Sequence, residues 1–472
     1  MRWTRIPPGR SPHRFRKDLK NNFSLLLMLL PSVLFFLLFA YLPMFGIVLA
    51  FERYNFRDRF FSPFVGLDNF RFLFSYQDVL SVIRNTVLYN LAFIAVNSVL
   101  QITCAVMLSQ LMGKWFKKIT QSVLFFPYFI SWVVVGAFAY NLMNYNNGLL
   151  TTLTGMHGGD KFDFYNTPVV WPFVLIIAGA WKSLGYGTIV YLAAIMGLDQ
   201  EMYEAGTIDG ANVFQKIRFI TLPCLIPTFI ILVLLSLGSI FRGNFEMFYQ
   251  LVGNNAILLP ITDVVDTYVT RALLQSSDVG LASAAGLVQS GSGCIIILFV
   301  HSLVRRDRGA HEPARRWIVK IGRISVLIRK RRDEFLFALL SYPLLALLSV
   351  ACLLPFVIIV ASSLTSEAAI VKYGYNLIPK EFSLEAYRLI LENPQEIRRA
   401  YFISLFVTAT GGGAGLFFCS MTAYVLSRKT FRWANRFSFF FYFTTLFSGG
   451  LVPWYILCVQ YLRFKQNPLL AL

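Results

Sequence analysis

Residues 199–223 read DQEMYEAGTIDGANVFQKIRFITLP and form a polar stretch between two long apolar runs. The part before Gly210 has the composition of a short helix, and a glycine after a helix favours the left-handed turn that closes it. Pro223 stands where a new helix can begin, because a proline at the first helical position loses no hydrogen bond. The pattern predicts two short helices that meet at Gly210 and form an elbow between longer apolar helices.

The apolar runs on both sides of the elbow are long enough to cross a membrane, which takes about 20 residues. Of the 472 residues, 56% are hydrophobic and 14% are charged, whereas about a quarter of a soluble chain is charged. This composition excludes a water-soluble globular enzyme and predicts an all-α polytopic membrane protein. We expect about nine spans, at residues 24–50, 85–111, 121–142, 169–197, 225–248, 282–304, 335–363, 400–426 and 437–459.

The formal charge of +19 has the placement of cytoplasmic membrane loops, which carry an excess of Lys and Arg. It does not predict a nucleic-acid surface. Basic residues crowd residues 1–20 and the stretch 305–334 between apolar runs. Counting spans from a cytoplasmic N-terminus also places the elbow in the cytoplasm. The first apolar run is too long for a signal-peptide core, so we expect a retained membrane span.

The sequence contains no pattern of metal, disulfide or nucleotide chemistry. The six cysteines lie in or beside apolar runs without C-x-x-C spacing, and the four histidines share no metal-ligand spacing. No Gly-rich stretch is followed by the G-K-[ST] of a phosphate-binding loop. We therefore expect no catalytic residue, no metal and no cofactor bound by this chain.

The elbow resembles the E-A-A-x3-G-x9-I-x-L-P loop of the permease subunits of binding-protein-dependent ATP-binding-cassette (ABC) importers. The matching positions are Glu204, Ala205, Gly210, Ile220, Leu222 and Pro223, with Asp209 beside the glycine. One position departs from the pattern, since Gly206 replaces the usual alanine. A glycine in a helix costs about 0.5–1 kcal/mol relative to alanine, so this departure predicts a somewhat looser elbow.

The resemblance implies a type I ABC importer bundle of about six spans in a bacterial cell membrane. It also implies that the elbow docks in a groove of an ABC ATPase subunit, which carries ATP and magnesium and hydrolyses the nucleotide. The other implied partners are a second permease subunit, an extracytoplasmic solute-binding lipoprotein and membrane lipid. In this mechanism, closure of the ATPase pair tilts the spans from an inward-open to an outward-open state.

Short sequence stretches before and after the basic stretch resemble two different types of permease. Residues 62–70, 127–132, 181–187 and 263–269 resemble the LplB-type sugar permeases, while residues 379–387, 423–429 and 447–453 resemble the N-terminal half of a YtcP-type partner permease. We therefore expect a complete permease unit at 1–310 and a basic cytoplasmic linker at 311–334. A truncated second unit of about three spans is expected at 335–472.

Several polar residues near the spans are candidates for the substrate path. They are Trp181, Lys182, Tyr186, Asn244 and Glu246, because sugars are held by aromatic faces and hydrogen bonds. An ionised Lys182 inside an apolar span must face water, a partner or a cavity, but it is equally well explained as a structural anchor. Arg242 and Glu246 have the spacing of a helical pair. The loop carrying Asp263, Asp266 and Tyr268 is either a docking surface for the binding protein or an ordered structural loop.

These observations predict a permease subunit that imports an oligosaccharide delivered by an extracytoplasmic binding protein. One alternative is a non-transporting relic of a truncated fusion. A membrane-embedded transferase is a further alternative, but it requires converging carboxylates or histidines at a membrane face, which this sequence does not offer.

Overall fold

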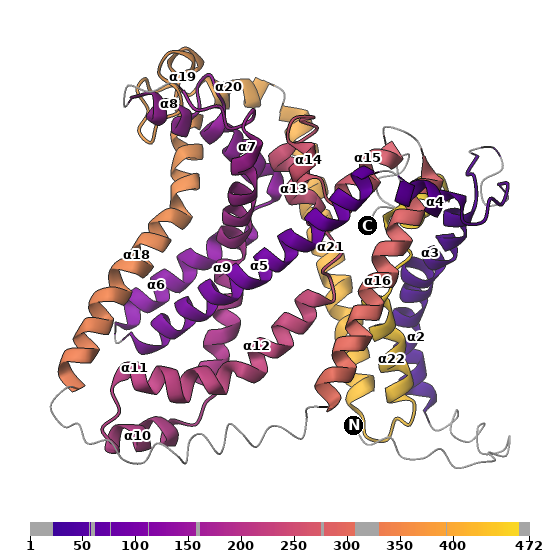
Figure 1. The fold of residues 1–472 in the computed structure, drawn as a ribbon, viewed down its shortest axis with the longest axis horizontal. Helices are drawn as coiled ribbons and strands as arrows, with labels where there is room; N and C mark the ends of the chain where they lie inside the picture. The colour runs from indigo at the N-terminus through magenta and orange to yellow at the C-terminus, as the bar shows by residue number, and fades with distance from the viewer. Residues whose placement is uncertain are drawn as a thin grey trace. The chain divides into compact units, whose positions relative to one another are not determined.

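The structure is a computed structural model that describes residues 22–55, 57, 62–75, 77–111, 113–156, 161–274, 278–306, 330–392 and 394–461. Within these ranges the regular structure is helical, and extended residues pair only in two isolated bridges, Glu52 with Phe64 and Thr365 with Phe382. The all-α prediction is confirmed (Figure 1). The basic residues 1–20 and the predicted linker up to residue 329 lie outside the described residues.

Seven helical segments of the described chain are long and apolar enough to cross a membrane. They are Phe23–Phe51, Val79–Gln110, Pro168–Met196, Val213–Leu237, Val279–Phe299, Asp333–Ser363 and Pro394–Ser427. An eighth candidate is the bent pair Lys114–Phe129 and Trp132–Met143. The polytopic prediction therefore holds, although three of the expected spans differ in detail.

The expected span at 121–142 is divided by a bend of 97°. Pro127 lies in the 3-10 turn η4 (Phe126–Phe129), and the backbone of Ile130 is extended after it. Ser131 then caps the next helix by accepting a hydrogen bond from the Val134 N–H. A residue that cannot donate, followed by a capping serine, ends one helix and starts another, which the apolar composition alone did not reveal.

Two more expected spans have other bounds than predicted. The run at 225–248 is interrupted because α12 (Leu222–Leu237) ends at Gly238 and α13 (Phe245–Val252) begins only after the cap Asn244. The run at 437–459 is interrupted at residues 447–450, where Gly450 has a φ of +90°. Few residues other than glycine adopt that backbone region, so the helix stops there.

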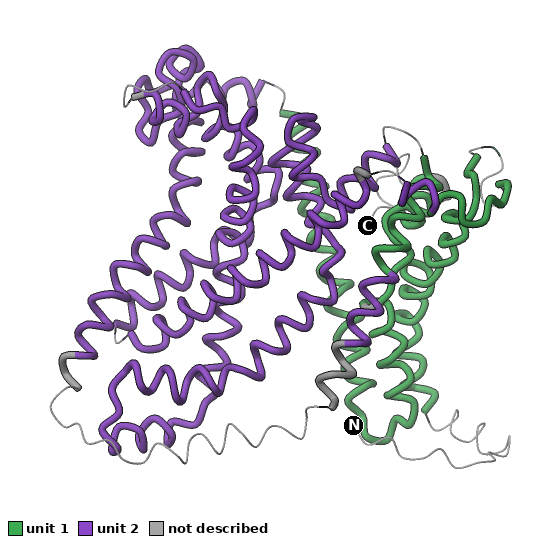
Figure 2. The backbone as a smooth tube through the Cα atoms, in the orientation of Figure 1, with its two compact units in different colours: residues 1–70, 277–290, 393–472 green, residues 71–276, 291–392 purple. Residues whose placement is uncertain are grey.

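The chain forms two compact units, and each unit contains residues from both sides of the basic stretch (Figure 2). Unit 1 comprises residues 1–70, 277–290 and 393–472, and unit 2 comprises residues 71–276 and 291–392. These units describe packing. The predicted division into 1–310, 311–334 and 335–472 concerns sequence relationship and stays a prediction.

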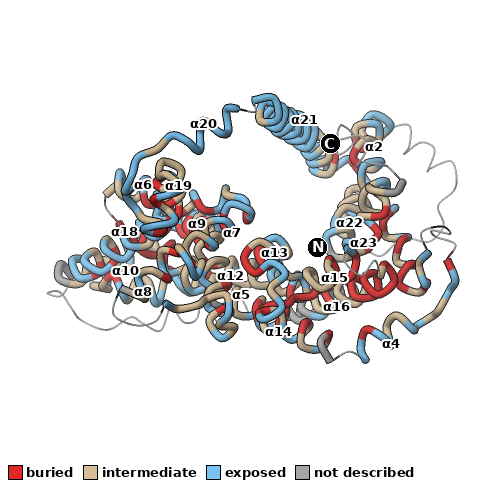
Figure 3. Tube along the Cα trace, turned by 90° about the horizontal axis from the view of Figure 1, so that it is seen from above, coloured by how far each residue is buried: buried red, intermediate tan, exposed pale blue. Residues whose placement is uncertain are grey.

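Unit 1 is built around the first apolar helix. Its elements are α2 (Phe23–Phe36), the π-turn η1 (Leu37–Tyr41), α3 (Leu42–Met44), η2 (Phe45–Phe51), α21 (Pro394–Ser427), α22 (Ala434–Leu446), α23 (Leu451–Ile456) and η8 (Leu457–Tyr461), with the beginnings of α4 (Asp68–Ser75) and α16 (Val279–Arg306). The helix α2 packs against α21 and α22, with Leu29, Val425 and Phe431 buried between them. The side chains of α21 are otherwise exposed along most of its length (Figure 3).

Unit 2 has a core of long helices with shorter ones at each end. Its elements are α5 (Gln77–Gln110), α6 (Lys114–Phe125), η4, α7 (Trp132–Met143), α8 (Leu149–Met156), η5 (Pro168–Val170), α9 (Trp171–Met196), α10 (Gln200–Ile208), α11 (Val213–Lys216), the π-turn η6 (Ile217–Thr221), α12, α13, α14 (Leu259–Thr262), α15 (Val265–Leu274), α18 (Lys330–Ser363), α19 (Glu367–Tyr373), α20 (Glu385–Glu392) and the rest of α4 and α16. The helices α5 and α9 pack along each other, with Leu108 and Tyr191 in the core between them. At Gly185 a Cβ would lie 2.2 Å from the Leu124 carbonyl oxygen, so only glycine permits this approach of α9 to α6.

Candidate functional site: the elbow between α9 and α12

The elbow lies at one end of unit 2, and α8, α19 and α20 lie at the opposite end (Figure 1). Its first helix, α10, begins at Asp199, whose side chain accepts a hydrogen bond of 3.0 Å from the Glu201 N–H. It closes with Ala211 N–H donating to the Gly206 carbonyl and Gly210 N–H donating to the Thr207 carbonyl. Gly210 has a φ of +76°, which is the left-handed turn that the sequence predicts.

The second helix of the elbow begins with a reciprocal cap. The Asn212 side chain accepts from the Gln215 N–H, and the Gln215 side chain accepts from the Asn212 N–H, both at 2.8 Å. From there α11, η6 and α12 run on without a break, so the membrane segment begins at Val213 and not at the predicted 225. Pro223 lies within this segment, directly after the π-turn, where the regular hydrogen-bond pattern is already interrupted.

Side-chain bonds hold α10 against the start of the membrane segment. The hydroxyls of Tyr203 and Thr221 share a hydrogen bond of 2.9 Å, and Lys216 donates to the Thr207 hydroxyl at 3.1 Å. Burial raises the pKa of the Tyr203 phenol above its usual value, while the hydrogen bond to Thr221 opposes that shift. The phenol therefore stays protonated at neutral pH. The two side-chain hydrogen bonds brace the elbow.

The departure at Gly206 has a packing explanation. A Cβ at this position would lie 3.1 Å from the Ile220 Cδ1, which is closer than ordinary side-chain packing. The glycine thus allows α10 to lie tightly against the start of the membrane segment. This close approach opposes the helix cost of glycine, and the looser elbow stays a prediction.

One face of α10 is left exposed. Glu201, Glu204, Ala205 and Ile208 follow helical spacing and are all exposed, and Asp209 at the end of the helix is exposed as well. The Ile208 side chain is 86% exposed. Sequence reasoning missed Ile208, although an isoleucine four residues after Glu204 in an otherwise polar stretch was a usable signal. The face combines carboxylates with an apolar anchor.

The predicted path residues of α9 lie at the bend between η4 and α7. The ammonium of Lys182 donates to the carbonyls of Tyr128 (3.2 Å), Pro127 (3.4 Å) and Ile130, and it also lies 5.3 Å from the centre of the Trp132 ring. These carbonyls are at a helix end and need donors. The contacts describe a structural anchor for the bend, and a role of Lys182 in the path stays a prediction.

The remaining path candidates have different surroundings in the described structure, and of these Glu246 interacts electrostatically with Lys182. Tyr186 is half exposed and stacks on Tyr128 with ring centres 5.1 Å apart. The Trp181 indole N–H is buried without a hydrogen-bond partner in the described structure. Asn244 caps α13 by accepting from the Met247 N–H, and Glu246 is exposed on that helix.

The prediction that Arg242 and Glu246 lie on one face of a single helix is wrong. Arg242 lies in the turn before α13, so the two residues do not belong to one continuous helix. The helix stops at Gly238 and restarts after Asn244, a break that the four-residue spacing of the charges does not indicate.

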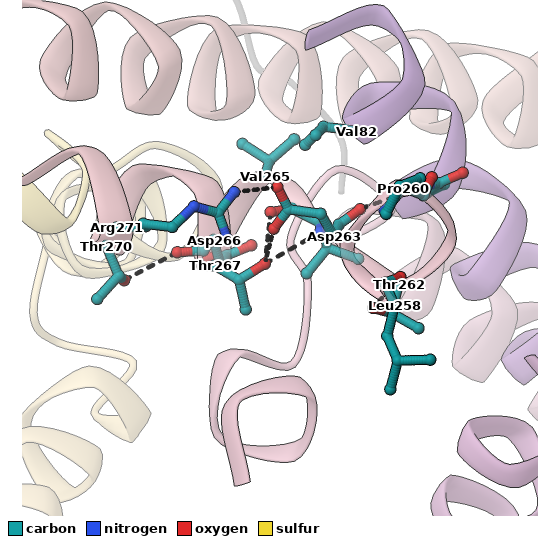
Figure 4. Close-up of polar contacts among 12 residues, drawn as sticks. Val82, Leu258, Pro260, Thr262, Asp263, Val265, Asp266, Thr267, Thr270 and Arg271 are labelled. Atoms are coloured by element: carbon teal, nitrogen blue, oxygen red, sulfur yellow. Dashed lines mark hydrogen bonds and ion pairs between the residues drawn. The ribbon is translucent and has the colours of Figure 1, made fainter. Parts of the chain in front are cut away.

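The acidic loop at the other end of unit 2 uses its carboxylates internally (Figure 4). Asp263 forms an ion pair with Arg271 and accepts a hydrogen bond of 2.6 Å from Thr267, and its side chain is 7% exposed. Asp266 accepts from the Gly243 N–H. These bonds account for an ordered structural loop, and docking of a binding protein here stays a prediction.

This loop is also tied to α5 through main-chain groups. Asn85 donates to the Pro260 carbonyl at 3.1 Å and to the Asp263 carbonyl at 3.3 Å, and the Val265 N–H donates to the Thr86 hydroxyl at 3.0 Å. Buried groups of this kind fix the position of a loop because each would be costly to leave unpaired.

Comparisons with known proteins place these features in context. Residues 101–308 match the sequence profile of the binding-protein-dependent transport system inner membrane component. The chain is 32% identical to the polygalacturonan/rhamnogalacturonan transport system permease protein YteP of Bacillus subtilis over 60% of this chain and 88% of YteP. It is 36% identical to the permease protein YtcP of the same system over 26% of this chain and 42% of YtcP.

A solved structure has a similar fold. The bacterial alginate ABC transporter, solved in complex with an alginate pentasaccharide-bound periplasmic protein, includes a chain that is 31% identical with a TM-score of 0.57. The similarity covers 62% of this chain and 98% of that chain.

Proposed function

Because the chain belongs to the family of binding-protein-dependent transport system inner membrane components, we propose that an ATPase subunit docks on its elbow, residues 199–223. The chain is a permease of an ABC carbohydrate importer, as its relatives for polygalacturonan and alginate are. The single observation that carries the docking proposal is the exposed face of α10, with Glu201, Glu204, Ala205 and Ile208.

The chemistry of this face suits a protein partner. The Glu204 carboxylate pairs with basic residues of the ATPase groove, and the small Ala205 side chain permits close approach. Ile208 supplies an exposed apolar side chain that a partner can bury. Because both helix ends are capped, docking costs little ordering of the backbone.

The elbow is connected to the membrane in a way that transmits movement. The helices α11 and α12 and the π-turn between them are continuous, and Tyr203 and Lys216 tie α10 to their beginning. A push on α10 therefore moves the span Val213–Leu237. The ATPase subunit binds ATP with magnesium and hydrolyses the ATP. This chain supplies the movement that alternates access.

The membrane orientation and the other subunits of the importer follow from the same family membership. The elbow and the N-terminus face the cytoplasm, because Lys and Arg are concentrated in residues 1–20 and 305–334 and cytoplasmic loops carry an excess of these residues. A second permease subunit and an extracytoplasmic solute-binding lipoprotein complete the importer. Aromatic faces such as the stacked pair Tyr128 and Tyr186 contact the sugar on its path.

The docking proposal is tested by co-purification from the host membrane. The tagged full chain is purified in mild detergent, and the amount of ABC ATPase subunit that it retains is measured by mass spectrometry. Glu204→Arg replaces the exposed carboxylate with a charge that repels a basic groove, and we expect the retained ATPase to fall at least about tenfold.

The matched control is Glu392→Arg. Glu392 is also exposed and undergoes the same change of charge, but it lies on α20 at the opposite end of unit 2. It should retain as much ATPase as the wild-type chain. Equal retention by the Glu204→Arg variant and the wild-type chain would overturn the proposal.

A further inference from the structure

The helix that follows the basic stretch packs against the elbow and not only against its own sequence neighbours. In unit 2, α18 contacts α11 and α6 (Figure 1). The Phe337 side chain is 7% exposed, and its ring meets the Phe214 ring of α11 edge to face with centres 5.6 Å apart. Val213, the first residue of α11, is buried in the same core as Phe337.

The contact continues along α18 beyond the elbow. The centre of the Tyr342 ring lies 4.8 Å from the centre of the Phe116 ring. The Tyr342 hydroxyl accepts a hydrogen bond of 3.3 Å from the N–H of Gly113, the N-cap residue of α6. Leu345 is buried in the same core. Further on, Phe356 lies 4.4 Å from Phe126, beside the bend that Lys182 anchors. One helix therefore touches both the elbow and the bend.

The burial of α18 is specific to one side. Phe335, two residues before Phe337, is 66% exposed, and Leu336 and Leu339 are exposed as well. Because the part of this helix from Phe335 onward is mostly apolar, an orientation set by lipid alone would not distinguish Phe335 from Phe337. Phe337 lies on the side of α18 that packs against α11 and the core of unit 2, and Phe335 does not.

We propose that α18 is a brace for the elbow and that Phe337 is a positioning residue for coupling, acting through Phe214. This inference rests on the proposed docking of an ATPase at α10. The segment after the basic stretch thus takes part in coupling within the same chain. When the elbow moves, α11 and α18 move together, and the movement reaches the bend at η4 through Tyr342 and Phe356.

Hydrogen–deuterium exchange of the purified full chain in detergent, without any ATPase, tests the brace. The readout is the exchange rate of the amides in α10 and α11 relative to those in α13 and α15, which pack together elsewhere in unit 2. Phe337→Ala should raise this ratio at least about threefold, the factor expected from the loss of one aromatic pair. Phe335→Ala is the matched control and should leave the ratio unchanged.

A conservative variant separates positioning from general stability. Phe337→Leu keeps an apolar side chain against Phe214 and should restore most of the wild-type ratio. If Phe337→Ala destabilises the whole chain, both sets of amides exchange faster, and the ratio still decides. If the ratio for Phe337→Ala equals the wild-type ratio, whether or not the whole chain is destabilised, the brace is overturned.

The two proposals fail in different ways. Glu204→Arg should lose ATPase without changing the exchange ratio, because its side chain is on the exposed face. Phe337→Ala should change the exchange ratio in the absence of ATPase. A chain that never retains ATPase but shows the Phe337 effect would refute the docking proposal and leave the brace standing.

Discussion

The elbow and the acidic loop, at opposite ends of unit 2, both carry carboxylates, but the carboxylates have different contacts. In the acidic loop, Asp263 and Asp266 bind Arg271, Thr267 and a main-chain N–H. In the elbow, the caps, Gly210 and the Tyr203 and Lys216 bonds hold the backbone, so Glu201 and Glu204 stay exposed. A docking surface of this kind draws its rigidity from the backbone and keeps its carboxylates available to a partner.

The largest expected effect is at the acidic loop. Asp263→Ala leaves Arg271 without its partner in a partly buried site, and we expect a loss of about 3 kcal/mol in the free energy of unfolding. The measurement is the unfolding of the purified chain in mild detergent. Glu201→Ala, on the exposed face of the elbow, should change that free energy by less than about 0.5 kcal/mol. Similar losses in the two variants would mean that the carboxylates do not differ in role.

Two glycines sharpen the comparison at the level of the backbone. Gly210 in the elbow and Gly253 after α13 have φ values of +76° and +64°, and alanine at either position should cost about 1–2 kcal/mol of stability. Only Gly210→Ala should also reduce the ATPase retained on co-purification, because only that turn orients the docking face. Equal retention by Gly210→Ala and Gly253→Ala would contradict the link between the turn and docking.

The smallest effect is expected at the departure from the family pattern. Gly206→Ala gains about 0.5–1 kcal/mol of helix propensity, but the new Cβ meets the Ile220 Cδ1 at 3.1 Å. The two terms oppose each other, so the free energy of unfolding should change by less than about 0.5 kcal/mol. The same unfolding measurement checks this value. A stabilisation of the full helix increment would show that Ile220 moves aside without cost.

Much of the fold could be predicted because its causes are local. Long apolar runs predict membrane helices wherever they occur, and seven of them appear as candidate spans in the described chain. The elbow could be found for the same reason, since Asp199, Gly210 and Asn212 cap and turn the chain through atoms only a few residues away. The bend at Ile130 was missed because Pro127 and Ser131 lie in a run whose apolar composition dominated the prediction.

The sequence by itself determined the class of protein, most of the spans and the place of the elbow, because apolar length and capping residues act over one or two helical turns. Only the tertiary structure decided what the polar and aromatic side chains do. Tyr342 meets the Gly113 N–H across 229 residues, and Asn85 meets the Asp263 carbonyl across 178. Whether a carboxylate, a lysine or a phenylalanine is exposed or paired depends on such distant partners, and no local pattern records them.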